Sequence, residues 1–200
     1  MAKTVDYYFT PPSPWTYLGH ERFVAMCRSA GATINVKPAD MGRIFSVSGG
    51  LPLNQRAEQR RAYRLHELAR WRDALGLPLN VHPRYFPVSG DAASRMIIAA
   101  RQEQGSEAAL KLAGALLRAV WADELNIADP ATLSSIAGNC GLAGQALLDA
   151  SQAAAVQAEY ERNTEEAIAA KVFGAPWYVV DGEPFWGQDR LDFVERALKR

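Results

Sequence analysis

The sequence predicts an α/β protein in which an all-helical segment is inserted between the two halves of a four-stranded sheet. A strand–helix–strand pattern occupies residues 4–37, and a strand–strand–helix pattern closes the chain. Between them the hydrophobic periodicity is helical. We therefore divide the chain into a discontinuous sheet domain, residues 1–45 and 171–200, and a helical insertion, residues 46–170. The 200 residues are 48% hydrophobic, which is enough for a full core.

The first half begins with a strand over Thr4–Phe9, because this run is rich in β-branched and aromatic residues. A helix is expected from Trp15 to about Ser29, with Gly31 as its stop and a second strand over Thr33–Lys37. Two strands joined through a helix are expected to run parallel with a right-handed crossover. The apolar face of the expected helix carries Tyr17, Val24 and Cys27.

The insertion is expected to begin with a loop over residues 46–52 and to continue as helices up to about Lys171. Asn54 is expected to cap the first long helix. Gly76 and Pro78 are expected to end it.

Later helices of the insertion are marked by caps and by apolar residues at three- and four-residue spacing. Asp91 is expected to cap one, and Asp129-Pro130 to start a short one that ends near Gly138. The apolar residues that define helical faces are Leu65, Leu68, Ala69 and Leu75, then Met96, Ile97 and Ala100, then Leu110, Leu117, Val120 and Trp121, and finally Val156 and Tyr160.

The β pattern returns after the insertion. Trp177–Val180 and Pro184–Trp186 are predicted strands, joined by a hairpin turn at Asp181-Gly182. The Ala175-Pro176 bond just before them is a candidate cis peptide. A closing helix is indicated by Leu191, Val194 and Leu198.

Charge and composition exclude several classes of protein. The 22 basic and 22 acidic residues balance, so no general field favours nucleic acid or an anionic membrane. No run approaches the roughly 20 apolar residues that span a bilayer, and no signal core precedes the first strand. We expect a cytoplasmic protein with neither a nucleic-acid nor a membrane partner. Motifs typical of metalloproteases, serine hydrolases and nucleoside triphosphatases are absent from the sequence.

The cysteines and histidines suggest no metal or redox site. Cys27 and Cys140 form no CxxC pair, and each is expected to be a buried, inert thiol. His20, His66 and His82 show no ligand spacing, so we expect surface or satisfied core residues and no metal.

Two features are candidates for a binding site. Ser13 lies where the first strand gives way to a helix, at the positive end of the helix dipole, where an anion or thiolate is stabilised. The alternative is that Ser13 only caps the helix. A basic cluster, for which a solvated helix face is the alternative, comprises Arg56, Arg60, Arg61 and Arg64.

Four segments, in order and spacing, carry a resemblance to a known family. They are Tyr7-Tyr8-Phe9 with Ser13-Pro14-Trp15-Thr16-Tyr17-Leu18, Arg70-Trp71, Lys171-Val172-Phe173-Gly174-Ala175-Pro176, and Phe185-Trp186-Gly187-Gln188-Asp189-Arg190. The chain resembles the 2-hydroxychromene-2-carboxylate isomerases, glutathione-dependent enzymes close to the kappa-class glutathione transferases. The resemblance covers essentially the whole chain. It implies a thioredoxin-like sheet with the helical insertion of the periplasmic disulfide oxidoreductases.

The resemblance also implies a glutathione site. Ser13 occupies the place of the nucleophilic cysteine of disulfide oxidoreductases and Thr16 that of the second, so the thiol must come from glutathione. Pro176 is implied to be cis, with the backbone of Ala175 pairing with the cysteinyl part of glutathione. The γ-glutamyl pocket is implied at Gln188 and Asp189.

Further residues are implied to face glutathione and the substrate. Asn54 matches the family, whereas Arg60 replaces a lysine and offers a planar fork in place of a point charge. Arg61 or Arg64 are alternatives for that role. The substrate ring also needs an apolar slot, for which the candidates are Trp15, Tyr85 and Phe86, and the alternative is that these are plain core residues.

The expected function is glutathione-dependent isomerisation of 2-hydroxychromene-2-carboxylate to trans-o-hydroxybenzylidenepyruvate in aromatic degradation of the naphthalene type, by a homodimer. The alternatives are a kappa-like transferase that releases the glutathione conjugate, a binding protein without turnover, and a disulfide oxidoreductase. The absence of CxxC argues against the last of these.

Overall fold

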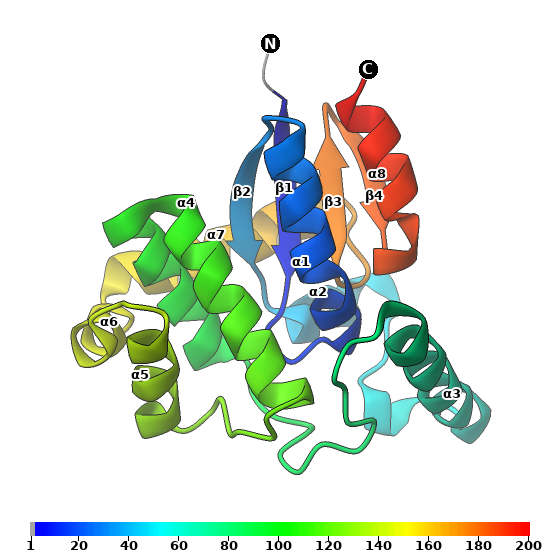
Figure 1. The fold of residues 1–200 in the computed structure, drawn as a ribbon, viewed down its shortest axis with the longest axis horizontal. Coiled ribbons are helices and arrows are strands. Elements are labelled where there is room, and N and C mark those ends of the chain that lie inside the picture. Colours follow the sequence, from blue (N-terminus) through cyan, green and yellow to red (C-terminus); the bar gives the residue numbers. More distant parts are fainter. Residues whose placement is uncertain (1–2) are drawn as a thin grey trace.

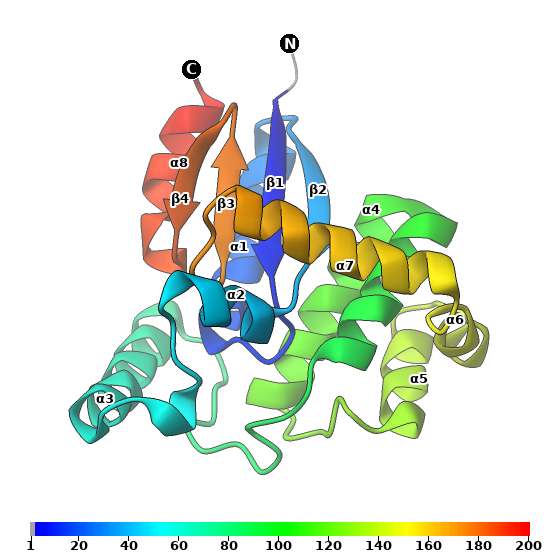
Figure 2. The same cartoon turned by 180° about the vertical axis from the view of Figure 1, so that it is seen from behind.

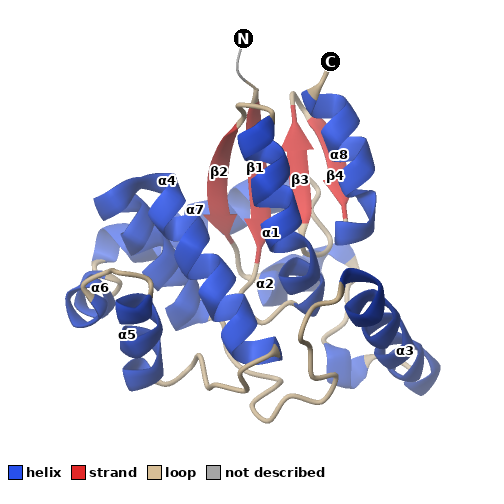
Figure 3. Cartoon of the chain, viewed as in Figure 1, coloured by secondary structure: helices blue, strands red, loops and turns tan. Residues whose placement is uncertain are grey.

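The computed structural model describes residues 3–200 and confirms the predicted α/β fold (Figure 1). Its strands are β1 (Thr4–Phe9), β2 (Thr33–Pro38), β3 (Trp177–Val180) and β4 (Glu183–Trp186), in the spatial order β2-β1-β3-β4. β1 and β2 are parallel, as expected for strands joined through a helix, and the other neighbours are antiparallel (Figure 3).

Helices cover both faces of the sheet. One face carries α1 (Pro14–Ser29) and α8 (Leu191–Leu198), and the other carries α7 (Ala154–Ala169) with α2 (Met41–Ser48), as Figures 1 and 2 show from opposite sides. This arrangement follows from the alternation along β1. Val5, Tyr7 and Phe9 belong to the main core, and Tyr8 to a smaller cluster on the other face.

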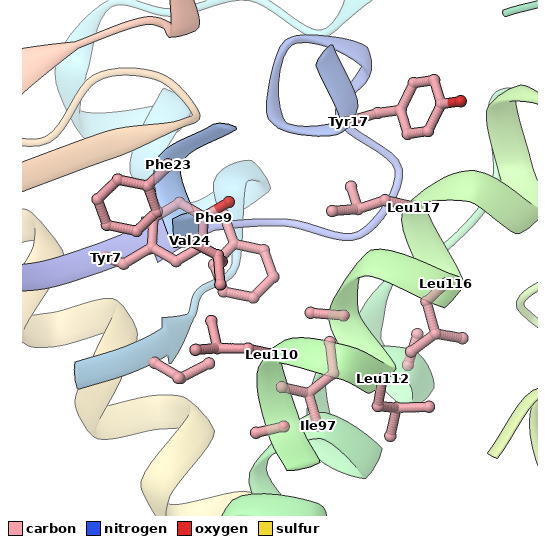
Figure 4. Packing of buried hydrophobic residues seen from close by; sticks show 14 of the residues in the cluster. Tyr7, Phe9, Tyr17, Phe23, Val24, Ile97, Leu110, Leu112, Leu116 and Leu117 are labelled. Atoms are coloured by element: carbon pink, nitrogen blue, oxygen red, sulfur yellow. The ribbon is translucent and has the colours of Figure 1, made fainter. Parts of the chain in front are cut away.

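The main core joins the sheet to the insertion. α4 (Asp91–Trp121) packs against α1 and β2, and its buried leucines and isoleucines meet the aromatic residues of the sheet (Figure 4). α5 (Pro130–Asn139) and α6 (Gly144–Ala150) pack on α4, whereas α3 (Glu58–Leu75) stands on the other side of the molecule (Figure 1). α3 contacts α1 and adds the buried Leu68 to the main core.

The prediction of a loop over residues 46–52 is wrong in part, because Met41–Ser48 is a helix. Asp40 caps it by accepting the N–H groups of Gly42 and Arg43, and Gly49 ends it with φ +75°. The helix forms because Met41 and Ile44, three residues apart, are buried on one face. The serines and glycines that suggested a loop lie at its exposed end.

Two predicted helix caps are also wrong. Asn54 lies in a separate 3₁₀ turn, Leu53–Gln55, and α3 begins after Ala57 without a side-chain cap. Asp91 is the first residue of α4 rather than its cap, and its carboxylate accepts the hydroxyl of Tyr160 at 3.0 Å.

Most of the remaining elements follow the expected pattern. The two helices expected between residues 91 and 121 are joined across a kink at Gly105, whose φ of +83° is non-helical. α6 was not predicted. The proposed boundary at residues 45/46 falls inside α2, and the division into two domains stays a prediction. Within residues 3–200, no helix combines the length and apolar character needed to cross a bilayer.

Candidate active site

Ser13 lies at the start of α1, directly after the turn that follows β1. Its N–H donates to the carbonyl of Thr10 at 3.0 Å, and its Oγ accepts the N–H of Thr16 at 3.2 Å, so Ser13 is the N-cap. Pro14, at the first helical position, brings no N–H. The positive end of the helix dipole therefore meets the Ser13 hydroxyl, and such an environment lowers the pKa of a bound thiol. Capping and thiol stabilisation are compatible at this position.

Ala175 and Pro176 come from the other half of the chain and lie beside Ser13. The Ser13 hydroxyl donates to the carbonyl of Ala175 at 3.5 Å, the long limit of a hydrogen bond, so its proton is available to a better acceptor. The Ala175–Pro176 peptide is cis, as predicted. Within residues 3–200 the N–H of Ala175 has no acceptor, which leaves a free donor like that of a sheet edge.

A cavity of about 1060 Å³ opens beside Ala175. Its volume is at the upper end of the range for small-molecule sites. Four parts of the chain form it: Trp15 of α1, the stretch from α2 to α3, α3 itself, and residues 173–190. Aromatic side chains contribute much of the wall, namely Trp15, Phe45, Tyr63, Trp71, Phe173 and Trp186.

Gln188 and Asp189 lie at the floor of this cavity, in a 3₁₀ turn (Gln188–Arg190) that precedes α8. Gln188 is buried, and its Oε1 accepts a hydrogen bond from Arg22 at 2.9 Å. Asp189 is exposed and pairs with Arg190 at 2.7 Å. α1 approaches this turn closely, because a Cβ on Gly19 would lie 2.6 Å from the Cβ of Gln188.

The basic cluster separates into distinct environments. Arg56 donates to the carbonyl of Leu51 at 2.7 Å, and Arg60 is exposed at the cavity wall. Arg64 is half-buried and lies over two aromatic rings, 5.3 Å from the centre of Phe86 and 5.6 Å from that of Trp121. Burial and the charge of Arg56 lower the pKa of Arg64 to about 10, so it remains a cation at neutral pH.

A second cavity of about 620 Å³ lies on the other side of Arg64. Asn54 and Phe86 line this cavity rather than the larger one, and Arg64 lines both. Tyr85 lines neither, because its exposed ring packs against Arg84. Of the predicted site residues, the larger cavity is lined by Trp15, Arg60, Ala175, Gln188 and Asp189. Ser13 does not line it but is hydrogen-bonded to Ala175, which does.

The chain's own thiols lie outside this site. Cys27 and Cys140 are free and buried, as expected. Burial raises the pKa of the Cys27 thiol to about 12 and also raises that of Cys140. His20 is buried between the Tyr7 hydroxyl (3.1 Å) and the Leu110 carbonyl (3.0 Å). A thiol nucleophile at Ser13 must therefore be brought by a ligand.

Three aromatic residues of the wall and one polar contact were not predicted as parts of the site. Trp71, Phe173 and Trp186 form part of the cavity wall, and the motifs that carry the resemblance contain them. The contact of Arg22 with Gln188 joins positions 166 apart, and nothing in the sequence pattern marks it.

Comparison with known proteins defines the class of the chain as a thioredoxin-fold protein: residues 4–199 match the family described as "DSBA-like thioredoxin domain". The 2-hydroxychromene-2-carboxylate isomerase of Sphingobium xenophagum is 32% identical over 99% of both chains. A solved 2-hydroxychromene-2-carboxylate isomerase superimposes with a TM-score of 0.83 at 27% identity, covering 98% of this chain and 95% of the other. Human glutathione S-transferase kappa 1 is 23% identical over 99% of this chain and 92% of its own.

The chain belongs to the 2-hydroxychromene-2-carboxylate isomerase family within the DsbA-like thioredoxin proteins, and it is an enzyme of the isomerase class. The resemblance stated from the motifs is thereby confirmed.

Proposed function

We propose that this isomerase uses glutathione to convert 2-hydroxychromene-2-carboxylate, or a closely related aromatic acid, to trans-o-hydroxybenzylidenepyruvate. The observation that carries the proposal is the Ser13 hydroxyl at the start of α1, 3.5 Å from Ala175 at the wall of a large cavity. The names of the isomerase relatives support the reaction. The name of the human kappa-class relative supports glutathione.

The residues around the larger cavity fit glutathione. The free N–H of Ala175 is available to the peptide backbone of the cysteinyl residue, as a strand edge would be. Asp189 would hold the γ-glutamyl ammonium, and the buried Gln188 would present its amide N–H groups beside it. Arg60 would meet a carboxylate of glutathione or substrate.

When bound, glutathione would supply a thiolate for addition to a conjugated carbon. The ring would then open, the resulting single bond would rotate, and elimination of the thiolate would leave the trans alkene. Ser13 donates a hydrogen bond to the sulfur, and the end of α1 favours its negative charge. A free thiol near pKa 8.5 is only a few per cent ionised at neutral pH, so this stabilisation raises the reactive fraction. The aromatic side chains of the wall offer an apolar surface to the substrate beside this thiolate.

A kappa-like transferase is the second candidate, because the human relative bears that name and Ser13 would act in the same way. We further propose that the enzyme works in aromatic degradation, in the cytoplasm and as a homodimer, as the family resemblance implies. The reducing cytoplasm supplies reduced glutathione, which such a site requires.

The experiment incubates the protein with glutathione and either the chromene or a chlorinated aromatic electrophile. Conversion of the chromene without net loss of glutathione is the expected result. Stoichiometric loss of glutathione with the chlorinated compound alone favours the transferase. Absence of glutathione binding by calorimetry contradicts both.

A further inference from the structure

Arg64 is a cation without a partner in a setting where cations are normally paired. Within residues 3–200 its guanidinium forms neither a hydrogen bond nor an ion pair, although it is half-buried. The other arginines around the two cavities are either paired or exposed. Arg56 donates to Leu51 and Arg190 pairs with Asp189, whereas Arg60 and Arg61 lie in solvent, where water hydrates an unpaired cation. Removing a cation from water without a partner is unfavourable, so the position favours an anionic ligand.

The aromatic pair beneath Arg64 fixes where its charge lies. The rings of Phe86 and Trp121 are 4.7 Å apart, and both lie within 6 Å of the guanidinium carbon. Trp121 is fully buried, and its Nε1 donates to the carbonyl of Pro12 at 3.3 Å. Pro12 immediately precedes Ser13. The cation is thus held on a rigid support that is itself tied to the loop carrying Ser13.

The second cavity supplies room for an apolar group next to this cation. Most of its wall is apolar, with Leu53, Leu65, Val81, Pro83, Phe86 and Pro87. Its charged members besides Arg64 are Glu58 and Arg61, both exposed. Since Arg64 also lines the larger cavity, a planar acid held here would lie next to the proposed thiol site.

We propose that Arg64, rather than Arg60, recognises the carboxylate of the aromatic acid, and that the 620 Å³ cavity receives its ring. The inference rests on the proposed function and deepens it, because it names how that site selects an acid. The planar guanidinium offers two parallel N–H groups to one carboxylate while its flat face stays on the rings.

The test measures equilibrium binding of 2-naphthoate and of its neutral counterpart 2-naphthamide, without glutathione. The wild-type protein is expected to bind the acid about 10- to 100-fold more tightly than the amide. Arg64→Met is expected to remove this preference while leaving the affinity for glutathione within about threefold. Arg64→Lys is expected to retain part of the preference, and thermal unfolding checks that both variants are folded.

Arg61→Met is the matched control, because it removes the same charge from an exposed position at the same cavity. It is expected to keep the preference for the acid. The proposal is overturned if Arg64→Met still prefers 2-naphthoate, or if Arg60→Met removes the preference in its place. It is also overturned if Arg64→Met chiefly lowers the affinity for glutathione. The wild type could also fail to bind glutathione while Arg64→Met still removes the preference for naphthoate. That result would contradict the proposed function and support the role of Arg64.

Discussion

The hydroxyl oxygen of Ser13 lies 3.5 Å from the carbonyl oxygen of Ala175, although 162 positions separate the two residues. The contact exists because β1 and β3 are neighbours in the sheet, with Tyr8 opposite Trp177. The residues that follow β1 and those that precede β3 therefore meet at the same end of the sheet. The insertion between them supplies α3 and its arginines, which face this meeting point.

Replacement of Ser13 by alanine separates its two roles. Loss of the cap is expected to lower the free energy of unfolding by about 1 kcal/mol. Loss of the donor to the sulfur is expected to lower kcat/KM for the glutathione-dependent reaction by about 10²-fold. Asp129→Ala is the matched control, because Asp129 caps α5 through the N–H of Thr132, away from the cavity. A similar loss of activity in both variants would show that Ser13 acts only as a helix cap.

Gly19 allows α1 to approach the turn that carries Gln188. In Gly19→Ala the new Cβ would lie 2.6 Å from the Cβ of Gln188, so the turn must move. We expect a loss of about 1–3 kcal/mol in stability and a higher KM for glutathione. Gly138→Ala is the control, since its Cβ would meet nothing within 4 Å in helix α5. Unchanged glutathione affinity in Gly19→Ala, measured by calorimetry, argues against a γ-glutamyl pocket at this turn.

The chain's own thiols are expected to be chemically inert in the folded protein. Burial raises the pKa of Cys27 to about 12, and that of Cys140 is also raised, so neither forms thiolate near neutral pH. Treatment of the glutathione-free protein with iodoacetamide at about pH 8, followed by removal of the reagent, should leave intact the activity measured with fresh glutathione. Mass spectrometry should find both cysteines modified only after addition of denaturant. Rapid alkylation with inactivation would mean that a protein thiol takes part in the reaction.

His20 should make the fold sensitive to mild acid. Its Nε2 must donate to the Leu110 carbonyl, so the neutral ring accepts the Tyr7 hydroxyl at Nδ1. Burial lowers the pKa of His20 below its usual 6.5. As the pH falls below about 6.5 the unfolded chain gains a proton that the folded chain does not, so stability falls, by at most about 1.4 kcal/mol per pH unit.

Urea unfolding between about pH 7 and 5 measures this effect. His20→Gln is expected to show a shallower pH dependence, whereas His66→Gln, at an exposed position, should follow the wild type. Equal slopes in all three proteins would show that His20 binds protons equally in the folded and unfolded states, which contradicts the prediction.

Much of the fold could be predicted from the sequence because it depends on local patterns. Strands β1 and β3 and helix α1 begin and end within one residue of their predicted bounds, because β-branched runs and apolar faces are local signals. α2 was missed because its short apolar face was outweighed by the serines and glycines at its end. The prediction that Asn54 caps α3 failed because Asn54 lies in a separate turn, and two further residues follow that turn before α3 begins.

The site residues that could be predicted from the sequence are those that lie in the motifs of the resemblance. Ser13, Ala175, Gln188 and Asp189 stand in segments that the resemblance identifies, and the structure brings these segments together. The environment of Arg64 could not be predicted from the sequence. It depends on the packing of α3 against Phe86 and Trp121, which lie elsewhere in the chain. From the sequence alone, the resemblance favoured Arg60 for the carboxylate, with Arg61 or Arg64 as alternatives.

The central claim is that Ser13 and the start of α1 stabilise the thiolate of bound glutathione. The most direct measurement is a pH titration of enzyme-bound glutathione, followed by the ultraviolet absorbance of the thiolate, in the wild type and in Ser13→Ala. We predict that the bound thiol of the wild type titrates clearly below the value near 8.5 of a free thiol, and that Ser13→Ala shifts it back toward that value. Titration of the bound thiol at the free value in the wild type would contradict the account.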